Sequence, residues 1–226
     1  MVRRIPRSVA VWLAWVLAAI AGTGLALAVV TARLLPVGDA ADTWTAEIVG
    51  ATLIAFPGFV VLRFLVGRSS LLTAIWIPVT VIGWLVASLA TGLSEQVLLS
   101  VGADSRLMPG GPIDYLTLVI GIEAITLAAF VGVGQGILLA RIFVRRAAAR
   151  LWLAANLVAA VVQWLVIESR AGSDSNAQTE LDLWLSPLLF AALYAALTGI
   201  ALVAITRDSR KTGVVAPAIA PAPAAR

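Results

Sequence analysis

The sequence predicts an all-α transmembrane protein, a bundle of six helices that cross a lipid bilayer. Of its 226 residues, 61% are apolar and only 12% are charged, whereas soluble domains have about 45–50% apolar and about 25% charged residues. The apolar residues fall in six long runs with few charges. Basic residues flank these runs almost entirely on one side, as expected of a polytopic membrane protein.

The length of each apolar run predicts one membrane-spanning helix. A helix needs about 20 mainly apolar residues to cross the hydrocarbon core, and it satisfies its own backbone hydrogen bonds there. A transmembrane β-barrel would instead show segments of about ten residues that alternate between apolar and polar. The predicted spans cover about residues 8–32, 46–67, 70–92, 116–141, 151–168 and 183–206.

Three features of this chain refine the spans. The first run is too long for a signal-peptide core of about 7–15 residues, so we expect it to be retained as a helix. Pro57 and Pro78 lie inside the second and third spans and are expected to kink them, because proline removes one helical hydrogen bond. Residues 1–206 form a single membrane domain, and the Pro- and Ala-rich segment 207–226 is predicted to be a disordered cytoplasmic tail.

The charges predict the orientation of the chain in the membrane. The N-terminal segment, the second-to-third and fourth-to-fifth connections and the C-terminal tail together hold 13 of the 16 basic residues. The other three connections hold three arginines and ten of the acidic residues. Because cytoplasmic loops carry the excess of Lys and Arg, we expect both termini on the cytoplasmic side of the cell membrane. The net charge of +4 is the small remainder of two faces of opposite charge, and the basic cytoplasmic face is expected to meet anionic lipid headgroups rather than nucleic acid.

The positions of Trp and Gly suggest an internal repeat. The outward-running helices carry Trp12, Trp76 and Trp152 near their cytoplasmic ends, and the inward-running helices carry Gly58, Gly136 and Gly199 in their cytoplasmic halves. This pattern is typical of three tandem helical hairpins that run in the same direction. It also fits chance, since Trp favours membrane interfaces and the chain has 18 glycines. The sequence leaves both interpretations open.

Small residues at four-residue spacing predict close packing between helices, because they let helix backbones approach in lipid. The residues expected to pack in this way are Ala14, Ala18, Gly22, Gly132, Gly136 and Gly199. Packing within the chain is the simpler interpretation. A second copy of the chain or another membrane protein docked on the first helix is the alternative.

Four polar residues within the spans are candidates for function, since polar groups in the membrane are costly: Glu123, Gln135, Asn156 and Gln163. Glu123 interrupts the run from Leu116 to Ala140 near its external boundary. It fits either a water-exposed interfacial position or a group that faces a cavity, where it would bind a cation or pass on a proton. Gln135 and Asn156 lie at equal depth on adjacent helices, which predicts a hydrogen bond between them.

The composition argues against an enzyme. The chain has no Cys and no His, which excludes disulfides, Cys/His zinc sites, haem with a histidine ligand and His-dependent catalysis. The glycine-rich run at 132–136 resembles half of a dinucleotide fingerprint, but it lies inside an apolar helix instead of between a strand and a helix. We therefore expect neither catalytic residues nor a cofactor or metal.

The six spans and the Trp and Gly pattern resemble small polytopic membrane proteins of bacteria, which implies no activity by itself. Six spans in about 200 residues, with an Ala-x-x-x-Ala stripe on the first helix, also look like the substrate-binding subunits of vitamin-uptake transporters. Two hypotheses follow. The first is an accessory component that binds another membrane protein, indicated by a filled interior. The second is a small-solute transporter or its binding subunit, indicated by a polar cavity at the candidate residues.

Overall fold

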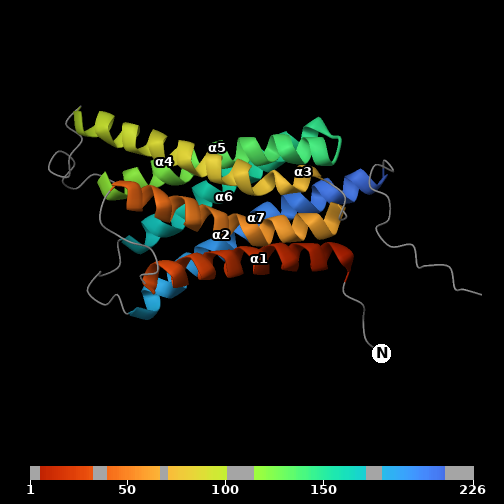
Figure 1. The fold of residues 1–226 in the computed structure, drawn as a ribbon, viewed down its shortest axis with the longest axis horizontal. Helices are drawn as coiled ribbons and strands as arrows, with labels where there is room; N and C mark the ends of the chain where they lie inside the picture. The colour runs from red at the N-terminus through yellow and green to blue at the C-terminus, as the bar shows by residue number, and fades with distance from the viewer. Residues whose placement is uncertain (1–5, 33–39, 67–70, 101–114, 172–179, 212–226) are drawn as a thin grey trace, which may run out of the picture.

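The computed structural model of the protein describes residues 6–32, 40–66, 71–100, 115–171 and 180–211, and these form helices and short turns without a strand. The helices are α1 (Arg7–Thr31), α2 (Ala40–Val66), α3 (Leu71–Ala74), α4 (Trp76–Ser100), α5 (Tyr115–Ile142), α6 (Arg146–Ala171) and α7 (Glu180–Lys211) (Figure 1).

Within the described residues, six helical stretches are long and apolar enough to cross a membrane. They are Arg7–Thr31, Trp44–Val66, Leu71–Ser94, Val119–Ile142, Arg146–Val166 and Leu185–Asp208. Each overlaps one of the spans expected from the sequence, so the all-helical fold with six candidate spans is confirmed. At the C-terminus, α7 continues to Lys211, past the predicted start of the tail at Arg207. The rest of the predicted tail, 212–226, lies outside the described residues.

The third span is divided by a break at Ile75. Pro78 cannot donate the backbone hydrogen bond that Ala74 would accept, and the chain turns at Ile75, whose N–H bonds Leu72 O at 3.3 Å. The helical pattern resumes where Val79 N–H donates to Ile75 O at 3.0 Å. The expected kink at Pro78 is therefore a break between α3 and α4. By contrast, α2 continues through Pro57.

A tight turn joins α5 to α6. The N–H of Arg145 donates to Ala140 O at 2.8 Å, and the N–H of Val144 donates to Arg141 O at 3.4 Å. This pattern is a Schellman cap, and Val144 has the positive φ of 51° that the cap requires. Because the turn is so short, α6 begins at Arg146, earlier than the start at 151 expected from the charges. Arginines can occupy the first turns of this helix, because their long side chains let the charged group reach polar surroundings beyond the helix end.

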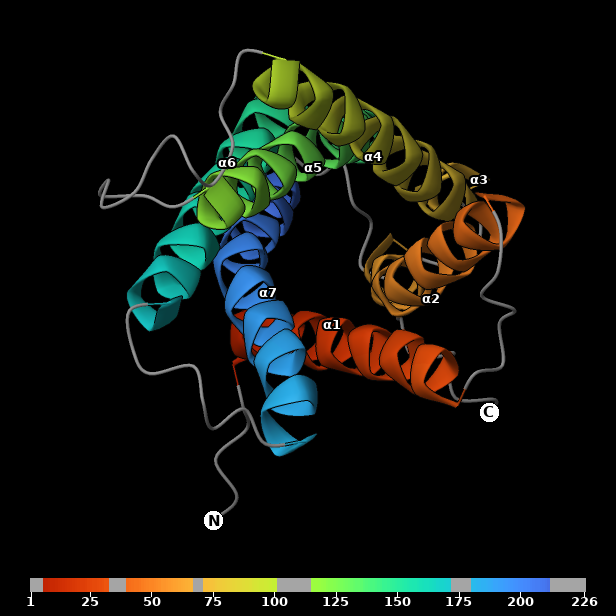
Figure 2. The same cartoon turned by 90° about the vertical axis from the view of Figure 1, so that its left-hand side faces the viewer.

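The six long helices form a closed ring. α2 packs between α1 and α4, α5 between α4 and α6, and α7 between α6 and α1. Figure 2 shows this ring from one end, with the helices diverging towards the viewer. The first and last helices of the chain therefore lie side by side.

Exposed arginines gather at one end of the ring, which we call the basic end. They are Arg7, Arg63, Arg141, Arg145, Arg146, Arg150 and Arg207. The buried hydrophobic cluster lies in the half of the bundle next to this end, and it is formed by side chains from α1, α2, α4, α5, α6 and α7. Towards the opposite end, the buried hydrophobic residues outside this cluster are mostly small, such as Ala51, Ala87, Ala128, Ala159 and Ala160. The bundle is thus tightly packed in one half and more open in the other.

Candidate functional site

Three buried tryptophans meet at the centre of the packed half. Trp15, Trp76 and Trp152 come from α1, α4 and α6, and they are 8%, 2% and 1% exposed. Their ring centroids lie 5.5–6.0 Å apart in edge-to-face pairs, the arrangement that aromatic rings prefer. The sequence pattern pairs Trp12, not Trp15, with Trp76 and Trp152 as the repeated tryptophan of the first helix. Trp12 instead donates to Ala196 O on α7 at 2.9 Å, and Trp15 occupies the centre.

Polar side chains connect this tryptophan cluster to its neighbours. Trp152 Nε1 donates to Gln135 Oε1 at 3.1 Å, and Gln135 Nε2 donates to Thr80 Oγ1 at 2.9 Å. On the other side, Trp15 Nε1 donates to Thr198 Oγ1 at 3.1 Å. Since Gln135 is buried, its bonds satisfy polar atoms that would be costly to leave unpaired in the membrane.

Asn156 is fully buried beside the same cluster. Its Nδ2 donates to the backbone oxygen of Trp152 at 2.8 Å, and its Oδ1 accepts a bond from the Tyr194 hydroxyl. The predicted direct bond between Gln135 and Asn156 is therefore wrong. Equal depth does not bring the two amides together, because Gln135 reaches towards α4 while Asn156 reaches towards α7, and Trp152 links them.

We expect Gln135→Met to lower the free energy of unfolding by about 1–2 kcal/mol, because it leaves the Trp152 N–H and the Thr80 hydroxyl short of a partner at nearly constant volume. Gln163→Met is the matched control. Gln163 is half-buried on α6, and within the described part of the chain no hydrogen bond ties it to this network. Unfolding in mixed micelles, followed by fluorescence, measures both. Equal stability losses would contradict the role assigned to Gln135.

The other candidate polar residue lies on the surface. Glu123 is exposed on α5, and it does not line the cavity described below. This position fits the first of the two interpretations given by the sequence, a carboxylate near the boundary of its span.

The predicted packing residues fall into two groups. Gly22, Gly132, Gly136 and Gly199 are buried, and an added Cβ would lie within 2.9–3.1 Å of atoms on a neighbouring helix at each of them. Ala18 is half-buried and Ala14 is exposed. The stripe on α1 therefore enters the bundle at Gly22 and faces outwards at Ala14.

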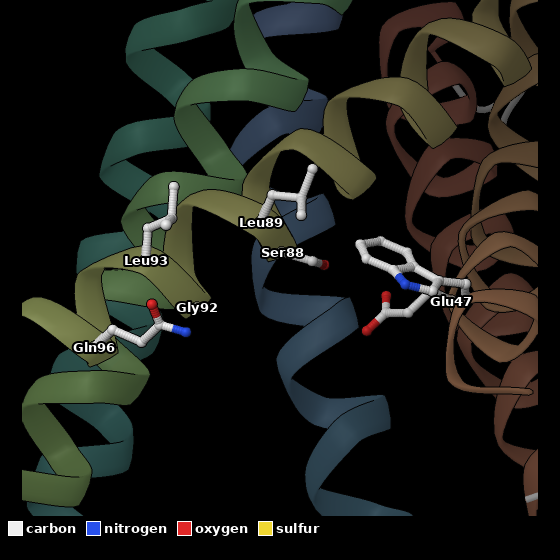
Figure 3. Close-up of a pocket in the computed structure, with 7 residues that line it drawn as sticks. Glu47, Ser88, Leu89, Gly92, Leu93 and Gln96 are labelled. Atoms are coloured by element: carbon white, nitrogen blue, oxygen red, sulfur yellow. The ribbon is translucent and has the colours of Figure 1, made fainter. Parts of the chain in front are cut away.

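A cavity of about 360 Å³ lies between α2 and α4, in the half away from the basic end. Figure 3 shows Glu47 on α2 and Ser88 and Gln96 on α4 directed into the gap between the two helices. The lining residues are Trp44, Glu47, Ser88, Leu89, Gly92, Leu93 and Gln96. The space opens to the surface of the bundle and is mostly apolar with a few convergent polar groups, a chemistry that small-molecule sites also use.

Glu47 is the one charged residue among those that line the cavity. It is half-buried, and one of its oxygens, Oε2, accepts a bond from Trp84 Nε1 of α4. The sequence interpretation missed Glu47 because it grouped this residue with the acids of the first external loop. The sequence did hold a signal for the other wall of the cavity. Ser88, Gly92 and Gln96 are spaced by four residues, which places them on one face of a helix.

Among the described residues no three His, Cys, Asp or Glu side chains lie close enough together to hold a metal ion. Asp208, at the basic end, pairs with Arg145 at 2.6 Å on the surface. Compared with protein-family models, with curated proteins and with solved structures, the chain matches none.

Proposed function

We propose that the protein is a non-enzymatic, membrane-embedded component that binds a small solute, and that the cavity between α2 and α4 is its site. One observation carries this proposal: the bundle is closed by buried tryptophans near the basic end, while a cavity with a carboxylate lies in the other half. A site that is closed on one side and reached from the other suits a binding subunit or a transporter. Gln135 and Asn156, which were expected to line such a cavity, lie in the closed half instead and serve its packing.

We also propose that both termini face the cytoplasm of the cell that carries this protein in its plasma membrane. The gathering of exposed arginines at one end supports this orientation, because basic residues concentrate on the cytoplasmic side. The basic end then meets anionic headgroups, and the cavity lies towards the external leaflet.

Single cysteines test the orientation directly, since the chain has none of its own. Thr31→Cys and Ala147→Cys replace exposed residues at opposite ends of the bundle. In spheroplasts we expect a membrane-impermeant maleimide to label position 31 at once, and position 147 only after the membrane is permeabilised. The reverse pattern would overturn the orientation.

Three tandem hairpins, α1–α2, α4–α5 and α6–α7, are proposed as the plan of the fold. Each indole of the tryptophan cluster lies against a glycine, or against the residue just before a glycine, on the preceding helix of the ring. Trp15 bonds Thr198 beside Gly199, and Trp152 bonds Gln135 beside Gly136. The Trp76 Nε1 atom lies 3.2 Å from the Cβ position of Gly58. This threefold correspondence supports the repeat.

A cavity-filling variant tests the proposed solute site. A Cβ added at Gly92 meets no atom of another part of the structure within 4 Å, so this position has room for a larger side chain. We expect the wild type, purified in mild detergent, to release a solute in stoichiometric amount on denaturation. Gly92→Phe should lose that solute, while Leu17→Phe, on an exposed face of α1 and outside the lining residues, should keep it. Retention by both variants would place the solute elsewhere and overturn the assignment.

A second candidate function is an accessory component that binds another membrane protein through α1. It is favoured by the outward face of this helix, where Ala14 is exposed beside Leu13 and Leu17, which are 39% and 63% exposed. Small residues on a lipid-facing helix allow a second helix to approach closely. Crosslinking in the native membrane, with Ala14→Phe as the blocking variant, tests it. A partner that is retained by the variant would contradict docking at this face.

A further inference from the structure

We propose that the cavity between α2 and α4 recognises an ammonium group that carries an apolar body, with Glu47 as the charge partner of the ammonium group. The inference rests on the proposed solute-binding function and names the chemical class of the ligand.

The charge of the lining favours a cation. Glu47 is acidic and none of the described residues that line the cavity is basic, so a bound anion would be repelled and a neutral ligand would gain less from the carboxylate than a cation does. A carboxylate has two oxygens with about four acceptor positions. The bond from Trp84 reaches Oε2, which leaves acceptor capacity for the N–H groups of a ligand. Charge-assisted bonds of this kind are about twice as strong as neutral ones.

The uncharged lining suits the rest of an ammonium ligand. The Trp44 indole lines the same cavity one turn before Glu47, and cations bind to the faces of aromatic rings, to Trp best of all. Ser88 and Gln96 add hydroxyl and amide oxygens that accept from N–H groups. In Figure 3, Ser88 and the Glu47 carboxylate point towards each other across the gap.

The remaining wall is apolar. Leu89 and Leu93 line the cavity and are 54% and 64% exposed, so they border both the cavity and the surface of the bundle. At about 360 Å³ the space is near the lower limit of small-molecule sites. It therefore suits a compact amine with one apolar group better than a large cofactor. The same chemistry occurs in two sources, a free solute and the ethanolamine headgroup of a lipid.

Three probes of nearly the same shape separate charge from shape: 2-phenylethylammonium, 2-phenylethanol and 3-phenylpropionate. Each is titrated by calorimetry into the full-length protein in dodecyl maltoside, an uncharged detergent without an ammonium group. We expect the ammonium probe to bind about tenfold or more tightly than the other two, the size of one charge-assisted contact. Glu47→Gln should remove this preference, because glutamine still accepts the bond from Trp84 but carries no charge.

Glu123→Gln is the matched control, since it removes an exposed carboxylate outside the cavity lining; it should leave the preference intact. A parallel titration with added phosphatidylethanolamine distinguishes the two sources. Competition by this lipid that disappears in Glu47→Gln supports the ammonium site with a lipid as the ligand, and absence of competition supports a free solute.

Equal binding of all three probes, or a cation preference that survives Glu47→Gln, would overturn the inference. If Gly92→Phe still abolishes binding in that case, the cavity is a solute site of another specificity and the proposed function stands. If no probe binds while the purified protein releases a stoichiometric solute that is not a cation, the ammonium inference alone fails. If neither probe nor co-purified solute is found, both fail.

Discussion

Trp152→Ala is expected to lower the free energy of unfolding by about 3–5 kcal/mol, the range for truncating a fully buried large aromatic residue. Trp152 is 1% exposed and touches both other rings of the tryptophan cluster, with centroids at 5.5 and 6.0 Å. Alanine would leave a cavity where three helices meet and would remove the donor to Gln135. Unfolding by sodium dodecyl sulfate in mixed micelles gives the free energy.

Two further variants separate the causes of that loss. Trp152→Phe keeps most of the ring but removes the N–H. It should lower the free energy of unfolding by about 1–2 kcal/mol, because it leaves the buried Gln135 Oε1 without a donor. Leu17→Ala truncates a side chain that is 63% exposed to the surroundings of the bundle. It should change stability by less than about 0.5 kcal/mol. If Leu17→Ala costs as much as Trp152→Ala, the tryptophan cluster is not the centre of stability.

The number and place of the helices were predictable from the sequence because their cause is local. A run such as residues 8–32 is apolar over the whole thickness of a bilayer, and only a helix satisfies its backbone there. The start of α6 and the end of α7 were less predictable. Both lie among arginines, whose charges look like loop signals although their long stems let the helix continue.

The partners of the polar residues were not predictable, because these helices are apolar on nearly every face. In a soluble protein the polar face of a helix shows which side is buried. Here the depth of Gln135 and Asn156 followed from counting residues, but their rotation about the helix axis did not. The two amides thus lie at matching depth and reach different helices. Glu47 was missed for a related reason: an acid near a helix start looks the same whether it faces water or a cavity.

The division of the bundle into a packed and an open half explains why the buried polar groups and the cavity are separate. In the packed half, Gln135 pairs with Trp152 and Thr80, and Asn156 pairs with Tyr194, so these bonds join α4, α5, α6 and α7. In the open half, Glu47 has a partner in Trp84 and still faces a cavity. Polar residues that are fully paired stabilise a membrane bundle, whereas a carboxylate beside open space is available for a ligand.

Gly22→Ala is expected to destabilise the protein by about 1–3 kcal/mol through overpacking, although alanine is the better helix former. A Cβ at Gly22 would lie 2.9 Å from Leu53 O and 3.0 Å from both the Cα and the O atom of Ile54. These are backbone atoms of α2, so no side chain can rotate away to make room. α1 and α2 would have to move apart, which loses the close contact that small residues provide in lipid.

Gly50→Ala provides the opposite case within the same pair of helices. No atom lies within 4 Å of a Cβ added at Gly50, so only the backbone entropy of glycine changes, and stability should rise by about 0.5–1 kcal/mol. The two substitutions are chemically identical, and their opposite signs would follow from the space around each glycine. Stabilisation by both would mean that α1 and α2 are not in close contact at Gly22.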